Sequence, residues 1–301
     1  MVPSVDPSSP ASGEIELASS TKLAVSRPLA DLCAEITEVV RLRQDYVLAQ
    51  GNIERQLKCI VRRLTGKAKV SNSDIDAYLK SAPDAARLHL GGLITVREYV
   101  KRSRRTYDKA CEQLARMLPV YGSFVEPLHG FGAIGLALIV GEAGDLANYD
   151  GPAKLRKRFG LAPFNGRAGA TWRRLGGLNK AQWEDLGYNP RRRSIMFVVV
   201  DSLLKKQNRY KVICDERKLL ERQKAEADGL TVAAAADIPD GQRDKYRSLG
   251  HIKARAERYV AQRLLLDLWK AWRGETISRM SHDHRMIVSP SPSQCATVGA
   301  L

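Results

Sequence analysis

Apolar residues recur at alternating intervals of three and four over a long segment near the start of the chain. The repeat has eleven positions within residues 29–64, and only Arg43 and Gln50 among them are polar. A repeat of this kind, sustained over about five heptads, is typical of a coiled coil, and polar residues at single positions fix its register at a cost in stability. We therefore expect residues 28–66 to form a coiled coil that makes the protein a homo-oligomer.

Three residues of this segment fit a coiled coil poorly. The aliphatic Val40 and Val61 fall outside the apolar seam, and Gly51 lies in the middle of the predicted helix. A glycine inside a helix costs about 1 kcal/mol relative to alanine. One long amphipathic helix that packs within its own chain is therefore the alternative.

The next part of the chain is predicted to be helical as well. The stretch SNSDIDAYL after Val70 opens with Ser, Asn and Asp, which are the residue types that cap a helix N-terminus. We expect a helical region to follow, with a break near Gly91-Gly92 and an end before Pro119. Residues 70–126 are thus interpreted as a helical connector.

The segment 127–273 contains several further helical patterns and few strands. We expect helices over residues 152–160, 191–206, 209–227 and 251–273. The β-branched run at 194–204 also fits a buried strand that would present Asp201 as a metal ligand, but its length favours a buried helix. The predicted fold class is mostly α.

Composition separates the two ends of the chain from this helical part. Residues 1–27 and 274–301 are rich in Ser and Pro and poor in aromatic residues. Such segments bury too little apolar surface to offset the entropy lost on ordering. We expect a disordered leader and a disordered tail.

Cysteine spacing and apolar run lengths exclude several classes. The five cysteines form no CxxC pair and their number is odd, which argues against a disulfide framework or a zinc site, so no metal ligand is assigned to this chain. The longest apolar runs are far short of the roughly 20 residues that span a bilayer, and no signal-peptide pattern is present. We expect a cytoplasmic protein with no membrane partner.

Positive charge is concentrated in one window. The chain has 49 Lys and Arg against 33 Asp and Glu, which gives a net charge of +16. Residues 151–195 alone contain two acidic and eleven basic residues, the latter being Lys154, Arg156, Lys157, Arg158, Arg167, Arg173, Arg174, Lys180, Arg191, Arg192 and Arg193. Neutralising phosphates releases condensed counterions, so this window predicts a nucleic-acid-binding surface.

Two glycines upstream of this window add a second candidate contact. Gly130 and Gly132 precede an apolar helical pattern, a layout that suits a helix-hairpin-helix turn in which backbone approaches phosphate. An ordinary turn between two helices is the alternative. The basic segment at 154–158 favours the DNA-binding interpretation.

Five motifs follow one another between Leu128 and Trp272. They are GFGAIGLALIVGEAGDL, LRKRFGLAP, AGATWRRLGGLNK, RRRSIMFVVV and the last helical pattern from Lys253. Their order resembles the C-terminal domain of the insertion-sequence transposases of the one-ten family, which are RNA-guided recombinases. The preceding RLRQDYVLAQGNIERQLKCIVRRL is similar to the coiled-coil connector of that family. The resemblance implies a helix-hairpin-helix-containing transposase domain over 127–273.

The resemblance also implies catalytic residues, and here the sequence departs from the family pattern. The family's nucleophilic serine is expected in the small-residue loop after GLAP, where Ala168 stands in this chain. Alanine has no hydroxyl, and Thr171 is the nearest substitute. Members are also expected to begin with an RNase-H-like domain that supplies metal-binding carboxylates, where this chain has only a polar leader. Magnesium is therefore expected only if such a domain is supplied in trans.

These observations lead to two functional hypotheses. The first is a protein of DNA transposition and recombination that binds DNA, and guide RNA in keeping with the resemblance, but is catalytically incomplete. The second is a non-catalytic nucleic-acid-binding or regulatory protein that assembles with a full-length transposase. Both predict that binding survives better than strand cleavage.

Overall fold

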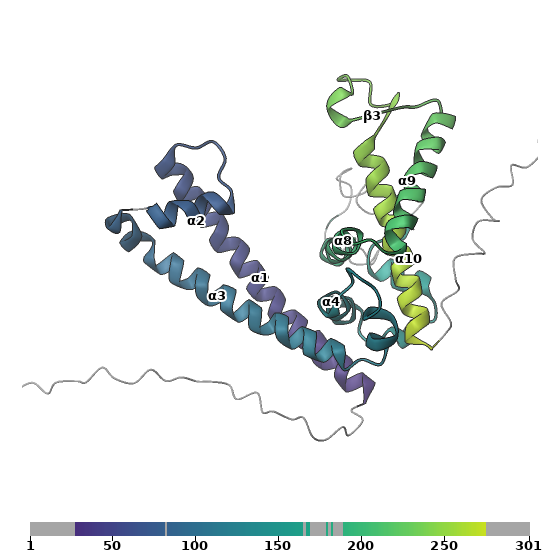
Figure 1. Ribbon diagram of the computed structural model, residues 1–301, viewed down its shortest axis with the longest axis horizontal. Coiled ribbons are helices and arrows are strands. Elements are labelled where there is room, and N and C mark those ends of the chain that lie inside the picture. Colours follow the sequence, from purple (N-terminus) through teal and green to yellow (C-terminus); the bar gives the residue numbers. More distant parts are fainter. Residues whose placement is uncertain are drawn as a thin grey trace, which may run out of the picture.

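The computed structural model describes residues 28–81, 83–164, 167–168, 179, 182 and 189–274. The described chain is mostly α-helical, as predicted, and has the shape of a V (Figure 1). Helices α1, α2 and α3 form one arm, and α9 and α10 form the other, with α4 and α8 near their junction. Among the described helices, none is both long and apolar enough to cross a membrane.

The first arm is a pair of long helices with a short helix at its far end. Helix α1 (Leu29–Thr65) ends at Gly66, whose φ of 69° allows its N–H to bond the Arg62 carbonyl. Helices α2 (Asn72–Ser81) and α3 (Asp84–Arg116) follow. The break expected near Gly91-Gly92 is wrong, because α3 runs through both glycines. Two helical glycines cost only about 2 kcal/mol, which the packing of α3 along α1 offsets.

Helix α1 packs against α3 of the same chain, which is the alternative that the sequence left open. Leu57 is fully buried in this arm, whereas Leu64, a position of the predicted seam, is 55% exposed. Val40, outside the seam, is buried because it lies against Gly141 of α4, where a Cβ atom would come within 2.6 Å of the valine. Packing against α4 thus buries a residue of α1 that lies outside the predicted seam. Self-association through residues 29–64 stays a prediction.

The two polar seam residues find their partners on α3. The Arg43 guanidinium lies 2.5 Å from an oxygen of Asp108, and Arg104 donates a hydrogen bond of 3.0 Å to the Gln50 side chain. Both contacts join residues more than fifty positions apart in the chain. They fix the register of α1 on α3 within one molecule.

The rest of the described chain forms a second core around α4. Its elements are η1 (Tyr121–Val125), α4 (Ala133–Ala143), η2 (Leu146–Asn148), α5 (Pro152–Arg158), α8 (Pro190–Leu204), α9 (Arg209–Ala227) and α10 (Leu249–Trp272). The side chains of Asn189, Asn208 and Ser248 cap α8, α9 and α10. The first turns of α1 share this core with α4, so the two arms are joined by apolar packing.

Strands are few and short in the described residues. Strands β1 (Pro163–Phe164) and β2 (Arg167–Ala168) pair antiparallel, and β3 (Thr231–Ala233) and β4 (Tyr246–Ser248) pair parallel, with η3 (Ala235–Asp237) between them. Residues 194–204 belong to α8, so the helical interpretation of that run is confirmed. Asp201 forms an i,i+4 ion pair of 2.6 Å with Lys205.

Candidate nucleic-acid interface

The two basic segments predicted to bind nucleic acid come together at the end of α4. One is α5 and the other is the first turn of α8, which the chain reaches only after the glycine-rich segment. Each begins with a proline in its first turn, where the missing N–H costs no helical hydrogen bond. Both segments contact Glu142, the penultimate residue of α4.

Glu142 organises this cluster of arginines. Its side chain is only 8% exposed, and its carboxylate lies 2.7 Å from Arg191 and 3.1 Å from Arg192. Its backbone carbonyl accepts a 3.0 Å hydrogen bond from Nε of Arg158. Glu142 therefore holds guanidinium groups from two helices, those of α8 through its buried carboxylate and that of α5 through its backbone carbonyl, and the cluster keeps a net positive charge.

The remaining basic residues of the two segments differ in their exposure and in their hydrogen-bond partners. Lys154 and Lys157 are exposed on α5, and Lys154 pairs with Asp150 one turn earlier. Arg156 is half-buried, and its Nε is buried without a hydrogen-bond partner. Arg193 turns inward and donates to the Gly160 carbonyl at 3.3 Å. The exposed lysines and Arg191 are thus the cations best placed to meet a phosphate backbone.

The structure gives Gly130 and Gly132 different surroundings. Gly130 has a φ of 91°, and a Cβ atom there would lie 2.9 Å from the Ser202 carbonyl oxygen and 3.0 Å from Cα of Leu203. The backbone that approaches Gly130 is therefore the end of α8. Gly132 is exposed at the N-cap of α4, and the space around its Cβ position is open. Only Gly132 is free to approach a ligand.

The glycine-rich segment is described in part. Arg167 and Ala168 form β2, in which Ala168 pairs with Pro163. Thr171, Arg173, Arg174 and Lys180 lie outside the described residues. The roles expected of these side chains stay predictions.

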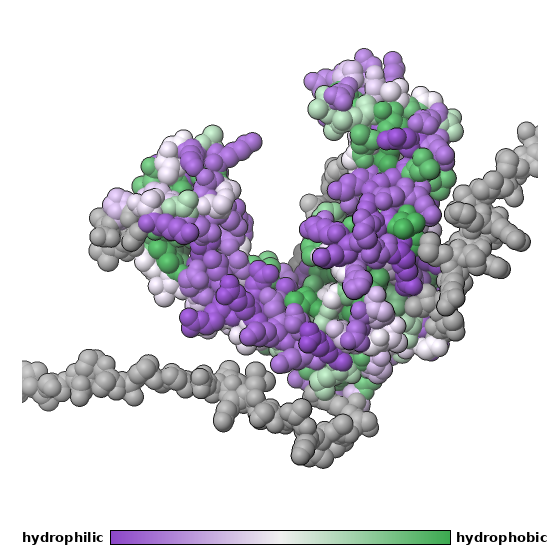
Figure 2. All heavy atoms as spheres, in the orientation of Figure 1, coloured by the Kyte–Doolittle hydropathy of each residue, from purple (hydrophilic) through white to green (hydrophobic). Residues whose placement is uncertain are grey.

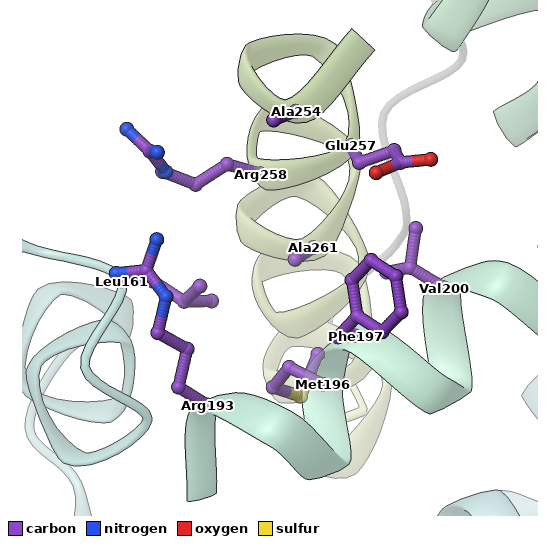
Figure 3. Close-up of a pocket in the computed structure, with 9 residues that line it drawn as sticks. All are labelled: Leu161, Arg193, Met196, Phe197, Val200, Ala254, Glu257, Arg258 and Ala261. Atoms are coloured by element: carbon purple, nitrogen blue, oxygen red, sulfur yellow. The ribbon is translucent and has the colours of Figure 1, made fainter. Parts of the chain in front are cut away.

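A cavity opens beside the point where this segment begins (Figure 3). It lies between α8 and α10, has a volume of about 120 Å³, and includes Leu161, Arg193 and Arg258 in its lining. The Leu161 carbonyl accepts a 2.9 Å hydrogen bond from Gln262 of α10, which fixes the entry of the segment against that helix.

Sequence reasoning missed Glu142 and Arg258. Glu142 lies nine residues before the basic window, in a segment whose pattern predicts an apolar, buried helix. Arg258 is one of several basic residues on an amphipathic helix, and only the packing of α10 on α8 brings it to Arg193. The sequence signal for Glu142 is an acidic residue inside an apolar helical pattern. Such a residue is buried only when it is paired, so this pattern predicts a basic partner.

No protein-family model, curated protein or solved structure matches the chain.

Proposed function

We propose that this chain binds nucleic acid through the basic surface formed by α5 and the first turn of α8. The observation that carries the proposal is the convergence of two distant basic segments on one residue, Glu142, whose carboxylate pairs with Arg191 and Arg192 of α8 and whose backbone carbonyl accepts from Arg158 of α5. One buried acid cannot neutralise the surrounding cations, and a surface of this kind favours a polyanion.

The biological role that fits this surface is DNA transposition or recombination, as the resemblance to the one-ten family implies. DNA is the main expected partner and structured guide RNA the second. Ala168 stands where the family's serine is expected, so binding without strand cleavage is the activity proposed for the chain itself. Both functional hypotheses drawn from the sequence share this activity.

The salt dependence of DNA binding tests the proposed surface. Each phosphate contact contributes about 0.9 to the slope of log affinity against log salt for duplex DNA. Replacing Lys154 and Lys157 with Gln should therefore weaken binding and reduce the slope by about 1.8 if each lysine meets one phosphate. The measurement is fluorescence anisotropy of a labelled duplex over a series of salt concentrations.

A matched control removes the same charge elsewhere. Arg222 and Lys224 are exposed on α9, and their double replacement with Gln should leave the slope nearly unchanged. Equal effects of the two double variants would show that net charge alone attracts DNA, and would remove the assignment of binding to α5.

A further inference from the structure

The cavity between α8 and α10 has two chemically different sides. The guanidinium groups of Arg193 and Arg258 lie together on one side, next to Leu161 (Figure 3). The ring of Phe197 lies on the opposite side, near Val200. Small residues of α10, Ala254 and Ala261, leave the space between the two sides open.

Among the described residues, neither guanidinium of the cationic side forms an ion pair with an acidic side chain. Arg193 makes its hydrogen bond to a backbone carbonyl, and Nε of Arg258 is buried without a hydrogen-bond partner. Glu257 also lines the cavity, but its carboxylate lies on the Phe197 side, 3.6 Å from Lys253. Two guanidinium groups are thus left facing one space without a carboxylate between them, which suits an anionic ligand.

The electrostatics of the cavity agree with this geometry. Burial, with the positive charges of Arg193 and Arg255, lowers the pKa of the Arg258 guanidinium from its usual value, and the negative charge of Glu221 opposes this only in part. A guanidinium nevertheless stays charged at neutral pH. An anion entering the cavity would relieve this repulsion between like charges.

The aromatic side is exposed although it is apolar. Phe197 is 60% exposed, far more than its neighbours Met196 and Val200, which are buried. Exposed aromatic rings beside cations are typical of proteins that bind single-stranded nucleic acid, because any base can stack on them. Bases inside a duplex are already stacked on one another and do not present their faces.

We propose that one unpaired nucleotide binds at this cavity, with its phosphate inside, between Arg193 and Arg258, and its base outside, against the exposed ring of Phe197. The inference rests on the proposed function, because it names the form of nucleic acid that the same region of the protein recognises. The cavity is adjacent to the basic surface, since Arg193 follows Arg191 and Arg192 on α8.

Binding of a single strand and of a duplex to two phenylalanine variants tests the pocket. The probes are a labelled DNA strand of about 12 nucleotides and a duplex of the same length. Phe197→Ala should weaken binding of the single strand about tenfold, the size expected for one lost base–aromatic stack, and leave duplex binding unchanged. Phe197→Tyr keeps a ring and should retain the affinity for the single strand.

Two controls match these changes in position and charge. Val198 is the next residue on α8, is 56% exposed and does not line the cavity, so Val198→Ala should have no effect on either probe. Arg258→Gln should weaken single-strand binding more than Arg222→Gln, which removes the same charge on α9. Because Phe197 is exposed, its replacement leaves the buried core of α8 in place.

The outcomes separate this inference from the proposed function. If Phe197→Ala behaves like Val198→Ala while the unmodified protein binds DNA, the nucleotide pocket is excluded and the basic surface stands. Equal losses for single strand and duplex would also exclude recognition of an unpaired base. If the unmodified protein binds neither probe, the proposed function itself fails.

Discussion

At the scale of single residues, two glycines of one predicted turn have different structural roles. Gly130 and Gly132 are separated by one residue, and the sequence pattern predicts the same role for both, in a turn that approaches phosphate. In the structure, Gly130 combines a positive φ with direct contact to the backbone of α8, whereas Gly132 has an ordinary extended backbone and an open surrounding. The spacing of glycines predicted the turn, but the partner of each glycine depends on a helix about seventy residues later.

Substitution of each glycine with alanine should affect the free energy of unfolding to different extents. Gly130→Ala should lower the free energy of unfolding by about 2 kcal/mol or more, because its Cβ meets backbone atoms at about 3 Å and its φ is unfavourable for alanine. Gly132→Ala should change it by less than about 1 kcal/mol. Urea denaturation followed by circular dichroism measures both values. Similar losses for the two variants would contradict the close approach of α8 to Gly130.

Glu142 shows how a residue of opposite charge shapes the predicted interface. The eleven basic residues of the window were counted as one surface, yet Arg191 and Arg192 pair with this carboxylate and Arg193 turns inward. Charge counting therefore indicated the proposed interface but overestimated the number of unpaired cations in the described part of the window. The pairing also explains why the α8 arginines hold fixed positions next to α5.

At the scale of elements, the pairing of α1 with α3 is the main difference from the coiled coil expected between chains. A seam of apolar residues specifies that a helix has a partner and says nothing about which molecule provides it. Arg43 and Gln50, which read as register-setting residues of an oligomer, meet Asp108 and Arg104 of the same chain.

A double-mutant cycle between Arg43 and Asp108 tests this pairing. Their side chains are only 12% and 23% exposed, so removing one partner leaves a poorly solvated charge. Arg43→Met and Asp108→Leu should each destabilise the protein, while the double variant should lose less than their sum by about 1.5 kcal/mol. Chemical denaturation of the four proteins gives this coupling energy.

Protein concentration distinguishes pairing within one chain from pairing between chains. The stability of an oligomer depends on protein concentration, whereas that of a helix pair within a monomer does not. We expect the coupling energy to be the same across a wide range of concentrations. A coupling that weakens on dilution would place the Arg43–Asp108 contact between two molecules and support the predicted homo-oligomer.

Most helices could be predicted from the sequence, because their periodicity and caps are local. The helix predicted over 209–227 coincides with α9, and Asn208 caps it with bonds to the N–H groups of Tyr210 and Lys211. The path of α3 through Gly91-Gly92 was missed, because the packing that holds it there comes from α1. The cavity was missed as well, since its residues come from helices about sixty positions apart and meet only in the folded chain.

At the scale of the whole molecule, two arms diverge from one shared core. Figure 2 shows an open space between the arms and mostly hydrophilic residues along α3 and around α8 on the face in view. The proposed interface and the cavity both belong to the core from which the second arm extends, close to Gly160 and Leu161. Ala168, where the resemblance implies the family's nucleophilic chemistry, pairs with Pro163, two residues after Leu161 of the cavity lining.

The final prediction concerns that chemistry. Serine-type strand cleavage needs a hydroxyl, a group that activates it, and cations that stabilise the charge of the reacting phosphate. The basic segments supply only the cations, because the position expected to hold the serine is Ala168. We predict that the chain forms no covalent adduct with DNA, even with magnesium present. Separation of the reaction products on a denaturing gel measures such an adduct directly.

Two further proteins make this prediction specific. Ala168→Ser alone should stay inactive and should form an adduct only when a family RNase-H-like domain and magnesium are added, because the resemblance implies that metal-bound carboxylates activate the serine. An adduct formed by the unmodified chain and lost in Thr171→Val would instead identify Thr171 as the nucleophile. Because Thr171→Val keeps the shape of the side chain and removes only its hydroxyl, that result would show that the chain retains its own strand-cleaving chemistry.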